Sequence, residues 1–201
     1  MSRQGFLVVL SGPSSVGKDT VLEAVLGHIP DMVYSVSATT RPPRPGEVHG
    51  VDYYFLSDEE FRELIRTDGL LEWAEYCDYL YGTPRAFVEE MVAQGKIVIS
   101  DIDIQGAEQI RRAMPDGVFI FLMPPSLEEL RRRIMRRATE PPEAIASRMA
   151  RAEEEMHNIV SYDYWILNAD LAQAVQDLKA ILRAERLRVR RGGYKKVGES
   201  L

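Results

Sequence analysis

The segment from Gly12 to Thr20 contains the residues of this sequence that are best suited to hold phosphate. It follows an apolar run and opens a helical pattern, which is the setting that a phosphate-binding loop requires. Its glycines allow backbone N–H groups to turn toward phosphate oxygens, and the helix N-terminus adds partial positive charge. We therefore predict a nucleoside triphosphate site, with Lys18 at the β and γ phosphates. Its residues are Gly12, Pro13, Ser14, Ser15, Val16, Gly17, Lys18, Asp19 and Thr20.

One position of this loop departs from the usual motif, because Asp19 stands where a hydroxyl residue normally follows the lysine. Thr20 could supply the Mg²⁺ ligand instead, directly or through water. Alternatively, Asp19 contributes to the metal shell or caps the helix. We favour Thr20, because a carboxylate beside a triphosphate is unfavourable unless a cation lies between them. The simpler interpretation of the whole segment is a glycine-rich turn without a chemical role.

A second candidate phosphate site lies in a proline-rich loop. Arg41 and Arg44 are three residues apart in this loop, and two guanidinium groups can bind a phosphate dianion through paired N–H donors. Tyr53 and Tyr81 would add neutral O–H donors. The alternative interpretation is two solvated arginines and two core tyrosines.

Several motifs, in this order along the chain, resemble those of guanylate kinases. They are Ser37–Phe55, Glu72–Glu75, Tyr81–Gly82, Asp101–Gly106, the arginine-rich segment Leu130–Arg137, and Asn168–Asp170. The resemblance extends from Phe6 to about Leu187. It implies transfer of the ATP γ-phosphoryl group to GMP with Mg²⁺ as cofactor, a reaction of purine metabolism and GMP recycling. It also implies that Arg41, Arg44, Tyr53 and Tyr81 hold the GMP phosphate.

Glu72 is the proposed guanine-recognition residue. Guanine presents N1–H and a 2-amino group side by side, and one carboxylate can accept from both, whereas adenine presents an acceptor at N1. Ser37 and Thr83 resemble the residues that contact O6 and N7 in the family, although serine is usual at the latter place. The alternative interpretation of Glu72 is a surface carboxylate before a buried Trp73.

Asp101 and Asp103 follow an apolar strand pattern, at the sheet edge where ligands of open α/β folds bind. The pair could bind Mg²⁺ through water, or the ribose or base of GMP, as the resemblance implies for Asp101. The alternative is a helix cap and a loop salt bridge.

Arginines of the segment 130–148 form a further group. Arg133, Arg137 and Arg148 match the lid arginines of guanylate kinases and are expected at the ATP phosphates, whereas the other arginines of this helix are expected to be solvated. Asn168 matches a residue near the adenine, although a strand-end asparagine is an equally simple interpretation.

The order of hydrophobic patterns indicates how these residues are positioned. Strands are expected at Phe6–Leu10, Tyr34–Thr39, Asp52–Leu56, Ile97–Ile102, Val118–Met123 and Tyr164–Leu167. Helices are expected at Thr20–Ile29, Thr83–Gln94, Ser126–Arg137, from Pro142, and at Asp170–Arg188. Strands alternate with helices at both ends of the chain, which favours a three-layer α/β/α core around a parallel sheet.

We predict one domain with the P-loop kinase fold, over residues 1–201. Its core would comprise 1–34, 83–137 and 149–188, with an inserted mixed-β GMP-binding subdomain at about 35–82. A helical lid would span about 138–148, and the basic tail 189–201 would be solvated.

Composition limits the partners. A net charge of −6 disfavours nucleic-acid binding, and the single cysteine excludes an intramolecular disulfide, which fits a reducing cytoplasm. No segment is apolar enough to suggest a membrane span. We therefore expect ATP and GMP as small-molecule partners, no nucleic acid or membrane, a cytoplasmic location, and a monomer or homodimer.

The expected mechanism requires no general base, because the acceptor phosphate is already an anion. Alignment and charge neutralisation would come from Lys18, Arg44, Arg133, Arg137 and Arg148. Two other interpretations remain: a kinase for AMP, UMP or dTMP, and a non-catalytic guanylate-kinase-like module that binds protein partners.

Overall fold

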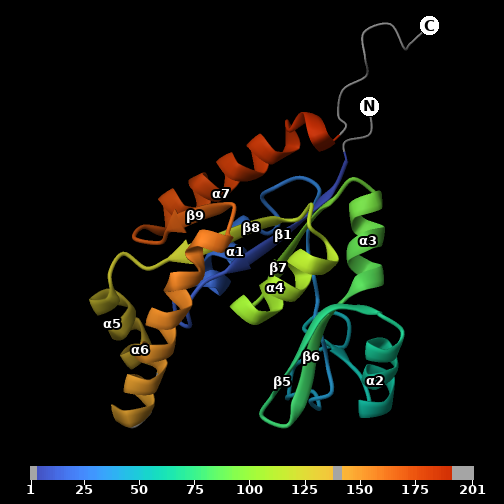
Figure 1. Cartoon of the computed structure of the whole chain (residues 1–201), viewed down its shortest axis with the longest axis horizontal. Coiled ribbons are helices and arrows are strands. Elements are labelled where there is room, and N and C mark those ends of the chain that lie inside the picture. The colour runs from blue at the N-terminus through green and yellow to red at the C-terminus, as the bar shows by residue number, and fades with distance from the viewer. Residues whose placement is uncertain (1–3, 138–141, 192–201) are drawn as a thin grey trace, which may run out of the picture.

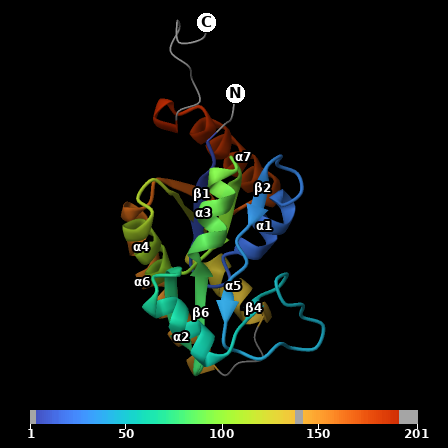
Figure 2. The ribbon, with the colours of Figure 1, turned by 90° about the vertical axis from the view of Figure 1, so that its right-hand side faces the viewer.

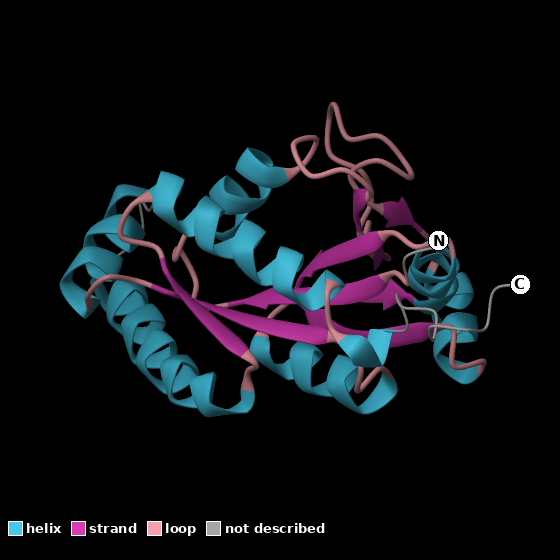
Figure 3. Cartoon of the chain, turned by 90° about the horizontal axis from the view of Figure 1, so that it is seen from above, coloured by secondary structure: helices cyan, strands magenta, loops and turns pink. Residues whose placement is uncertain are grey.

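A five-stranded parallel sheet forms the centre of the protein, with the strand order β2-β7-β1-β8-β9. The computed structural model describes residues 4–137 and 142–191. Figure 1 and Figure 3 show helices on both faces of this sheet, which confirms the predicted three-layer α/β arrangement. The strands are β1 (Phe6–Ser11), β2 (Met32–Tyr34), β7 (Ile97–Asp101), β8 (Val118–Met123) and β9 (Tyr164–Leu167).

Strand β1 is buried along its whole length because it lies in the middle of this sheet. Its side chains alternate between two hydrophobic clusters. Phe6, Val8 and Leu10 pack with α1 (Lys18–Val25) and α7 (Leu171–Arg186). Leu7 and Val9 pack with α3 (Arg85–Ala93) and α4 (Ile104–Ala113) on the opposite face. The apolar run that ends at the phosphate-binding loop is thus fixed from both sides.

A second, mixed sheet has the order β4-β3-β6-β5, with β3 parallel to β4 and antiparallel to β6. Figure 2 shows it beside the core together with α2 (Asp58–Arg66). Helix α2 begins with a capping box between Ser57 and Glu60 and buries Phe61 against the sheet. The strands are β3 (Ala38–Thr39), β4 (Tyr54–Phe55), β5 (Leu70–Tyr76) and β6 (Tyr79–Pro84).

Helices α5 (Leu127–Arg137) and α6 (Pro142–Met156) pack on each other through their own small cluster, followed by η1 (His157–Ser161). In Figure 1 this pair and the mixed sheet project from the same end of the core, one on each side. Residues 138–141 of the predicted lid lie outside the described residues, as does the side chain of Arg137.

Several predicted elements differ from the structure. The helix expected at Thr20–Ile29, for example, is Lys18–Val25, and the strand expected at Asp52–Leu56 is Tyr54–Phe55. The expected strand Tyr34–Thr39 is divided, because β2 ends at Tyr34 in the parallel sheet and β3 begins at Ala38 in the mixed sheet. The helix predicted from Thr83 begins only at Arg85, since Thr83 pairs with Glu72 in the ladder between β5 and β6. Long-range strand pairing here overrides the local helical pattern.

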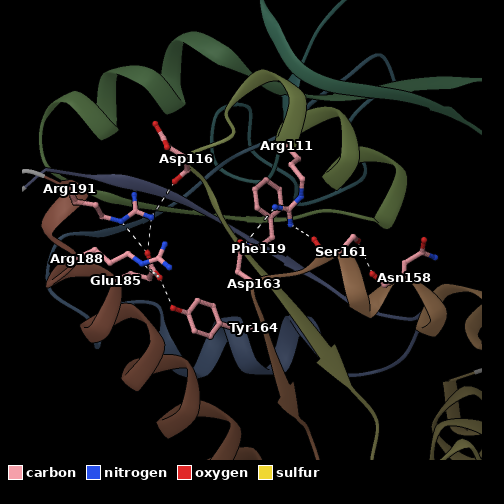
Figure 4. Close-up of polar contacts among 10 residues, drawn as sticks. All are labelled: Arg111, Asp116, Phe119, Asn158, Ser161, Asp163, Tyr164, Glu185, Arg188 and Arg191. Atoms are coloured by element: carbon pink, nitrogen blue, oxygen red, sulfur yellow. Dashed lines mark hydrogen bonds and ion pairs between the residues drawn. The ribbon is translucent and has the colours of Figure 1, made fainter.

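The end of α7 is tied to the core by a buried carboxylate. Glu185 is fully buried and accepts hydrogen bonds from Tyr164 Oη at 2.6 Å and from Arg191 at 2.8 Å, and Arg188 lies 3.3 Å away (Figure 4). The prediction of a solvated tail from residue 189 is therefore wrong for Arg191, whereas Val189 and Arg190, the other residues of η2 (Val189–Arg191), are exposed. Residues 192–201 lie outside the described residues.

Candidate functional site

The phosphate-binding loop joins the end of β1 to the start of α1. Gly17 is the N-cap of α1 and has a left-handed backbone, with φ of 103°. A Cβ atom there would lie 2.7 Å from Nδ2 of Asn168, so only glycine fits. That amide nitrogen donates to the Val16 carbonyl at 2.8 Å, and Asn168 is buried at the end of β9. The structure thus places Asn168 directly beneath the loop.

Lys18 and Asp101 meet where β1 and β7 end side by side. The Lys18 ammonium donates to the Gly12 carbonyl at 3.1 Å and lies 3.7 Å from Oδ1 of Asp101. Burial raises the pKa of Asp101 to about 6, although the Lys18 charge opposes this shift. A cation and a carboxylate therefore occupy the carboxyl edge of the parallel sheet, as the strand pattern predicts.

Two of the predicted arginines reach the phosphate-binding loop. Arg133 of α5 donates to the carbonyls of Val16 at 2.9 Å and Asn168 at 3.0 Å. Arg148 of α6 donates to the Ser14 hydroxyl at 2.8 Å. Helices α5 and α6 therefore each bring an arginine to the phosphate-binding loop. Arg133 already donates to two backbone carbonyls.

The proline-rich loop holds Arg41 through a residue that we did not assign from the sequence. Glu47 accepts from both terminal nitrogens of Arg41 at 2.9 Å, and it also accepts the Arg44 backbone N–H at 2.7 Å. Hydrogen bonding from Arg41 lowers the pKa of Glu47. Arg41 is buried, whereas Arg44 is exposed. An acidic residue six positions after an arginine, across a Pro-Gly turn, is the signal that could have identified this pair.

Tyr53 and Tyr81 lie beside Arg41. The Arg41 guanidinium is 5.3 Å from the centre of the Tyr53 ring, and the two tyrosine rings meet edge to face at 6.1 Å. Burial raises the pKa of Tyr53, so its hydroxyl stays protonated as a donor at neutral pH. The structure therefore brings Arg41, Tyr53 and Tyr81 together, with Arg44 on the adjoining turn.

Glu72 is a buried carboxylate on β5, 7% exposed. The Thr83 hydroxyl donates to its Oε1 at 2.7 Å. Burial raises the pKa of Glu72 to about 7, with the charge of Asp103 adding to the shift. Ser37 lies half-buried just before β3. The surface interpretation of Glu72 is therefore wrong.

The start of α4 lies against Glu72. A Cβ atom at Gly106 would be 3.0 Å from Oε2 of Glu72, so the glycine permits this close approach. Asp103 accepts the Gly106 N–H at 2.8 Å and so caps α4. Capping is the alternative that the sequence left open for Asp103.

Tyr34, at the end of β2, is influenced by charged or ionisable groups of both candidate phosphate sites. Burial raises its pKa to about 12, and the nearby Asp101, Tyr53 and Asp19 add to this shift because each opposes a negative charge on the phenol. Asp101 and Asp19 belong to the triphosphate side, whereas Tyr53 belongs to the second phosphate site. One side chain is thus within electrostatic reach of both.

The donor set fits Mg²⁺ held mainly by phosphate and water. In the part of the chain that the structure describes, no three His, Cys, Asp or Glu side chains gather as a metal site. Mg²⁺ needs only one or two protein oxygens beside phosphates and waters. The exposed Thr20 and the Asp101 carboxylate, both next to the loop, offer such oxygens.

Among the helices of residues 4–137 and 142–191, none has the length and apolar character that a membrane span requires.

Comparisons with known proteins agree with this geometry. The model of the family described as guanylate kinase matches residues 4–185. The guanylate kinase of Symbiobacterium thermophilum is 53% identical over 94% of this chain and 90% of its own length. A guanylate kinase of Thermus thermophilus is 50% identical over 98% of this chain and 87% of its own.

Solved structures give the same result. The guanylate kinase of Anaplasma phagocytophilum has a TM-score of 0.73 at 38% identity and covers 94% of this chain and 90% of its own. A gluconokinase of Sinorhizobium meliloti, at 18% identity and a TM-score of 0.52 over 96% of this chain and 100% of its own, shares the fold. The predicted P-loop kinase fold is confirmed by these matches.

Proposed function

The chain belongs to the guanylate kinase family, and on that premise we propose how its residues divide the reaction in which ATP and GMP give ADP and GDP. The observation that carries the proposal is that one short segment, from Asp101 to Gly106, touches both candidate sites. Asp101 lies 3.7 Å from the Lys18 ammonium, and a Cβ atom at Gly106 would lie 3.0 Å from the Glu72 carboxylate. Two nucleotide sites so close together suit direct transfer between two nucleotides.

The donor site would be built on the loop from Gly12 to Thr20. Its backbone N–H groups and the start of α1 favour anionic oxygens. Lys18 would exchange its contacts with Gly12 and Asp101 for the β and γ phosphates. Arg148, already at the Ser14 hydroxyl, would neutralise charge at the loop, as would Arg133. For Arg137 the same role stays a prediction from the sequence.

The acceptor site would lie on the mixed sheet. Arg41, Arg44, Tyr53 and Tyr81 would hold the GMP phosphate. This is supported by the contacts of Glu47 with both arginines, and by the position of the two tyrosine rings beside Arg41. The Glu72 carboxylate would accept from guanine N1–H and the 2-amino group. Thr83, Ser37 and Asp101 would complete the contacts to the nucleoside.

Asn168 would act chiefly by supporting the loop under the donor nucleotide, since its amide binds the Val16 carbonyl. For the domain division we propose a core, a GMP-binding part at about 35–82 that includes most of the mixed sheet, and a lid at about 138–148. We propose a cytoplasmic enzyme that acts on small molecules, as a monomer or homodimer.

The chemistry of the step lies in alignment and charge. Mg²⁺, when bound, would neutralise phosphate charge, and Thr20 and Asp101 are the residues that would hold it. Lys18 and Arg148 would stabilise charge on the transferring group, and Arg41 would orient the attacking phosphate oxygen. No side chain needs to remove a proton, because that oxygen is already anionic.

A coupled assay that follows ADP formation with GMP, AMP, UMP and dTMP in turn tests the proposal. We expect turnover with GMP and little with the other three, since each lacks the pair of adjacent donors that Glu72 accepts from. Comparable rates with AMP or UMP would contradict it. A protein that bound ATP in calorimetry but transferred phosphate to none would also contradict it.

A further inference from the structure

Gln109 makes two reciprocal hydrogen bonds with one residue of the mixed sheet. Its Oε1 accepts from the Trp73 backbone N–H at 3.2 Å, and its Nε2 donates to the Trp73 carbonyl at 3.1 Å. Gln109 belongs to α4 of the core, whereas Trp73 belongs to β5 (Figure 1). A single side chain therefore joins the core to the strand that carries Glu72.

The position of β5 explains why these bonds matter. β5 is an edge strand of the mixed sheet, and the outward N–H and C=O groups of an edge strand have no neighbouring strand to pair with. The Gln109 amide has one donor side and one acceptor side, as a peptide group does. The Gln109 amide thus takes the place of a neighbouring strand at Trp73. It thereby fixes the backbone of the residue that directly follows Glu72.

Helix α4 also contacts Glu72 itself. Gly106 allows the helix to approach Oε2 of Glu72, while Thr83 of β6 holds Oε1. The Glu72 carboxylate therefore lies between α4 and β6. The distance between these two elements depends on how α4 is attached to β5. Gln109 and Glu72 also line one pocket of about 480 Å³.

We propose that Gln109 is a positioning residue for guanine recognition, which holds the Glu72 carboxylate at the spacing that a pair of adjacent N–H donors requires. The inference rests on the proposed role of Glu72 in reading guanine. Bidentate recognition tolerates little displacement, because both acceptor oxygens must meet their donors at once.

The test is Gln109→Met, which keeps the length of the side chain and removes both hydrogen bonds. We expect KM for GMP to rise by about tenfold and the preference for GMP over IMP to fall by a similar factor, because IMP lacks the 2-amino group. KM for ATP and kcat at saturating GMP should stay within about twofold of wild type. Gln94→Met is the matched control, since the Gln94 amide donates to Glu90 on the exposed surface at the end of α3.

A double-mutant cycle with Glu72→Gln separates this inference from the proposed function. If Gln109 acts through Glu72, Gln109→Met should add little to the GMP defect once Glu72 is replaced. Unchanged GMP kinetics in Glu72→Gln would contradict the role of Glu72. A defect in Glu72→Gln together with wild-type GMP and IMP kinetics in Gln109→Met would overturn the role of Gln109 alone. Equal losses toward ATP and GMP would also overturn it, because they indicate a general structural effect.

Discussion

The hydroxyl of Thr83 donates to the carboxylate of Glu72 at 2.7 Å, yet Glu72 still has a pKa raised to about 7. One hydrogen bond does not compensate for burial of the charge. The carboxylate that we propose to bind guanine is therefore in an environment that disfavours its ionised form until a ligand supplies donors. This relationship leads to two predictions.

Glu72→Gln should stabilise the ligand-free protein at pH 8. The pKa of Glu72 is near its ordinary value in the unfolded chain and about 7 in the folded protein, so the unfolded state releases this proton at lower pH. The contribution of Glu72 to stability therefore falls as pH rises from about 4.5 to 7 and stays low above that. We expect a gain of about 1–3 kcal/mol in urea unfolding at pH 8, shrinking toward pH 5. A variant less stable than wild type at pH 8 would contradict this.

The same ionisation should control the use of GMP. We expect kcat/KM for GMP to rise between pH 6 and pH 8, because the ionised Glu72 carboxylate accepts from guanine and its pKa is about 7. The phosphate of GMP also ionises in this range. Glu72→Gln is therefore the control, and its shallower profile should reflect the phosphate together with Asp101, whose pKa is about 6. Identical pH profiles in the two proteins would exclude Glu72 as the titrating group.

Glu47→Gln should weaken GMP binding without affecting ATP. Glu47 holds Arg41 in a two-point contact and bonds the Arg44 backbone, so its loss should disorder both arginines. We expect KM for GMP to rise by about tenfold, with KM for ATP unchanged. Glu63→Gln on the exposed face of α2 is the matched control. If KM for GMP instead falls, Glu47 competes with the GMP phosphate for Arg41 rather than orienting it.

Glu185→Gln should reduce stability and leave catalysis intact. Burial alone would raise the pKa of Glu185, but hydrogen bonds from Tyr164 and Arg191 and the charges of Arg191 and Arg188 lower it overall. A carboxylate with a lowered folded pKa stabilises the fold at neutral pH, and this contribution is lost as pH falls below the ordinary pKa of a glutamate and then through the lower pKa of the folded state. We expect a loss of about 2–4 kcal/mol at pH 7, because the arginines would lose their buried partner. Unaltered unfolding with intact KM values would show that the network contributes nothing measurable.

The sequence predicts the phosphate-binding loop and the central strands well because their signals are local. Phe6–Leu10 is a continuous apolar run, and the glycines and lysine that follow it have fixed spacing. Strands Val118–Met123 and Tyr164–Leu167 are found at the predicted bounds for the same reason.

The hairpin of β5 and β6 and the residues that support the site were not predictable in the same way. Thr83 continues a helical pattern, and only its pairing with Glu72 places it in a strand. Asn168, Tyr34 and Gln109 act through neighbours that are distant in sequence, such as Val16 and Trp73. No local spacing encodes such contacts, because they depend on how separate elements pack.

The most direct measurement follows the γ-phosphoryl group itself. With ATP radiolabelled at the γ position and unlabelled GMP, the wild-type protein should place the label in GDP, one GDP for each ADP formed. Lys18→Met should fold normally by circular dichroism and form labelled GDP at least about a thousandfold more slowly, because the charge at the β and γ phosphates is lost. Label released as inorganic phosphate, or transferred at a near-normal rate by Lys18→Met, would contradict the account.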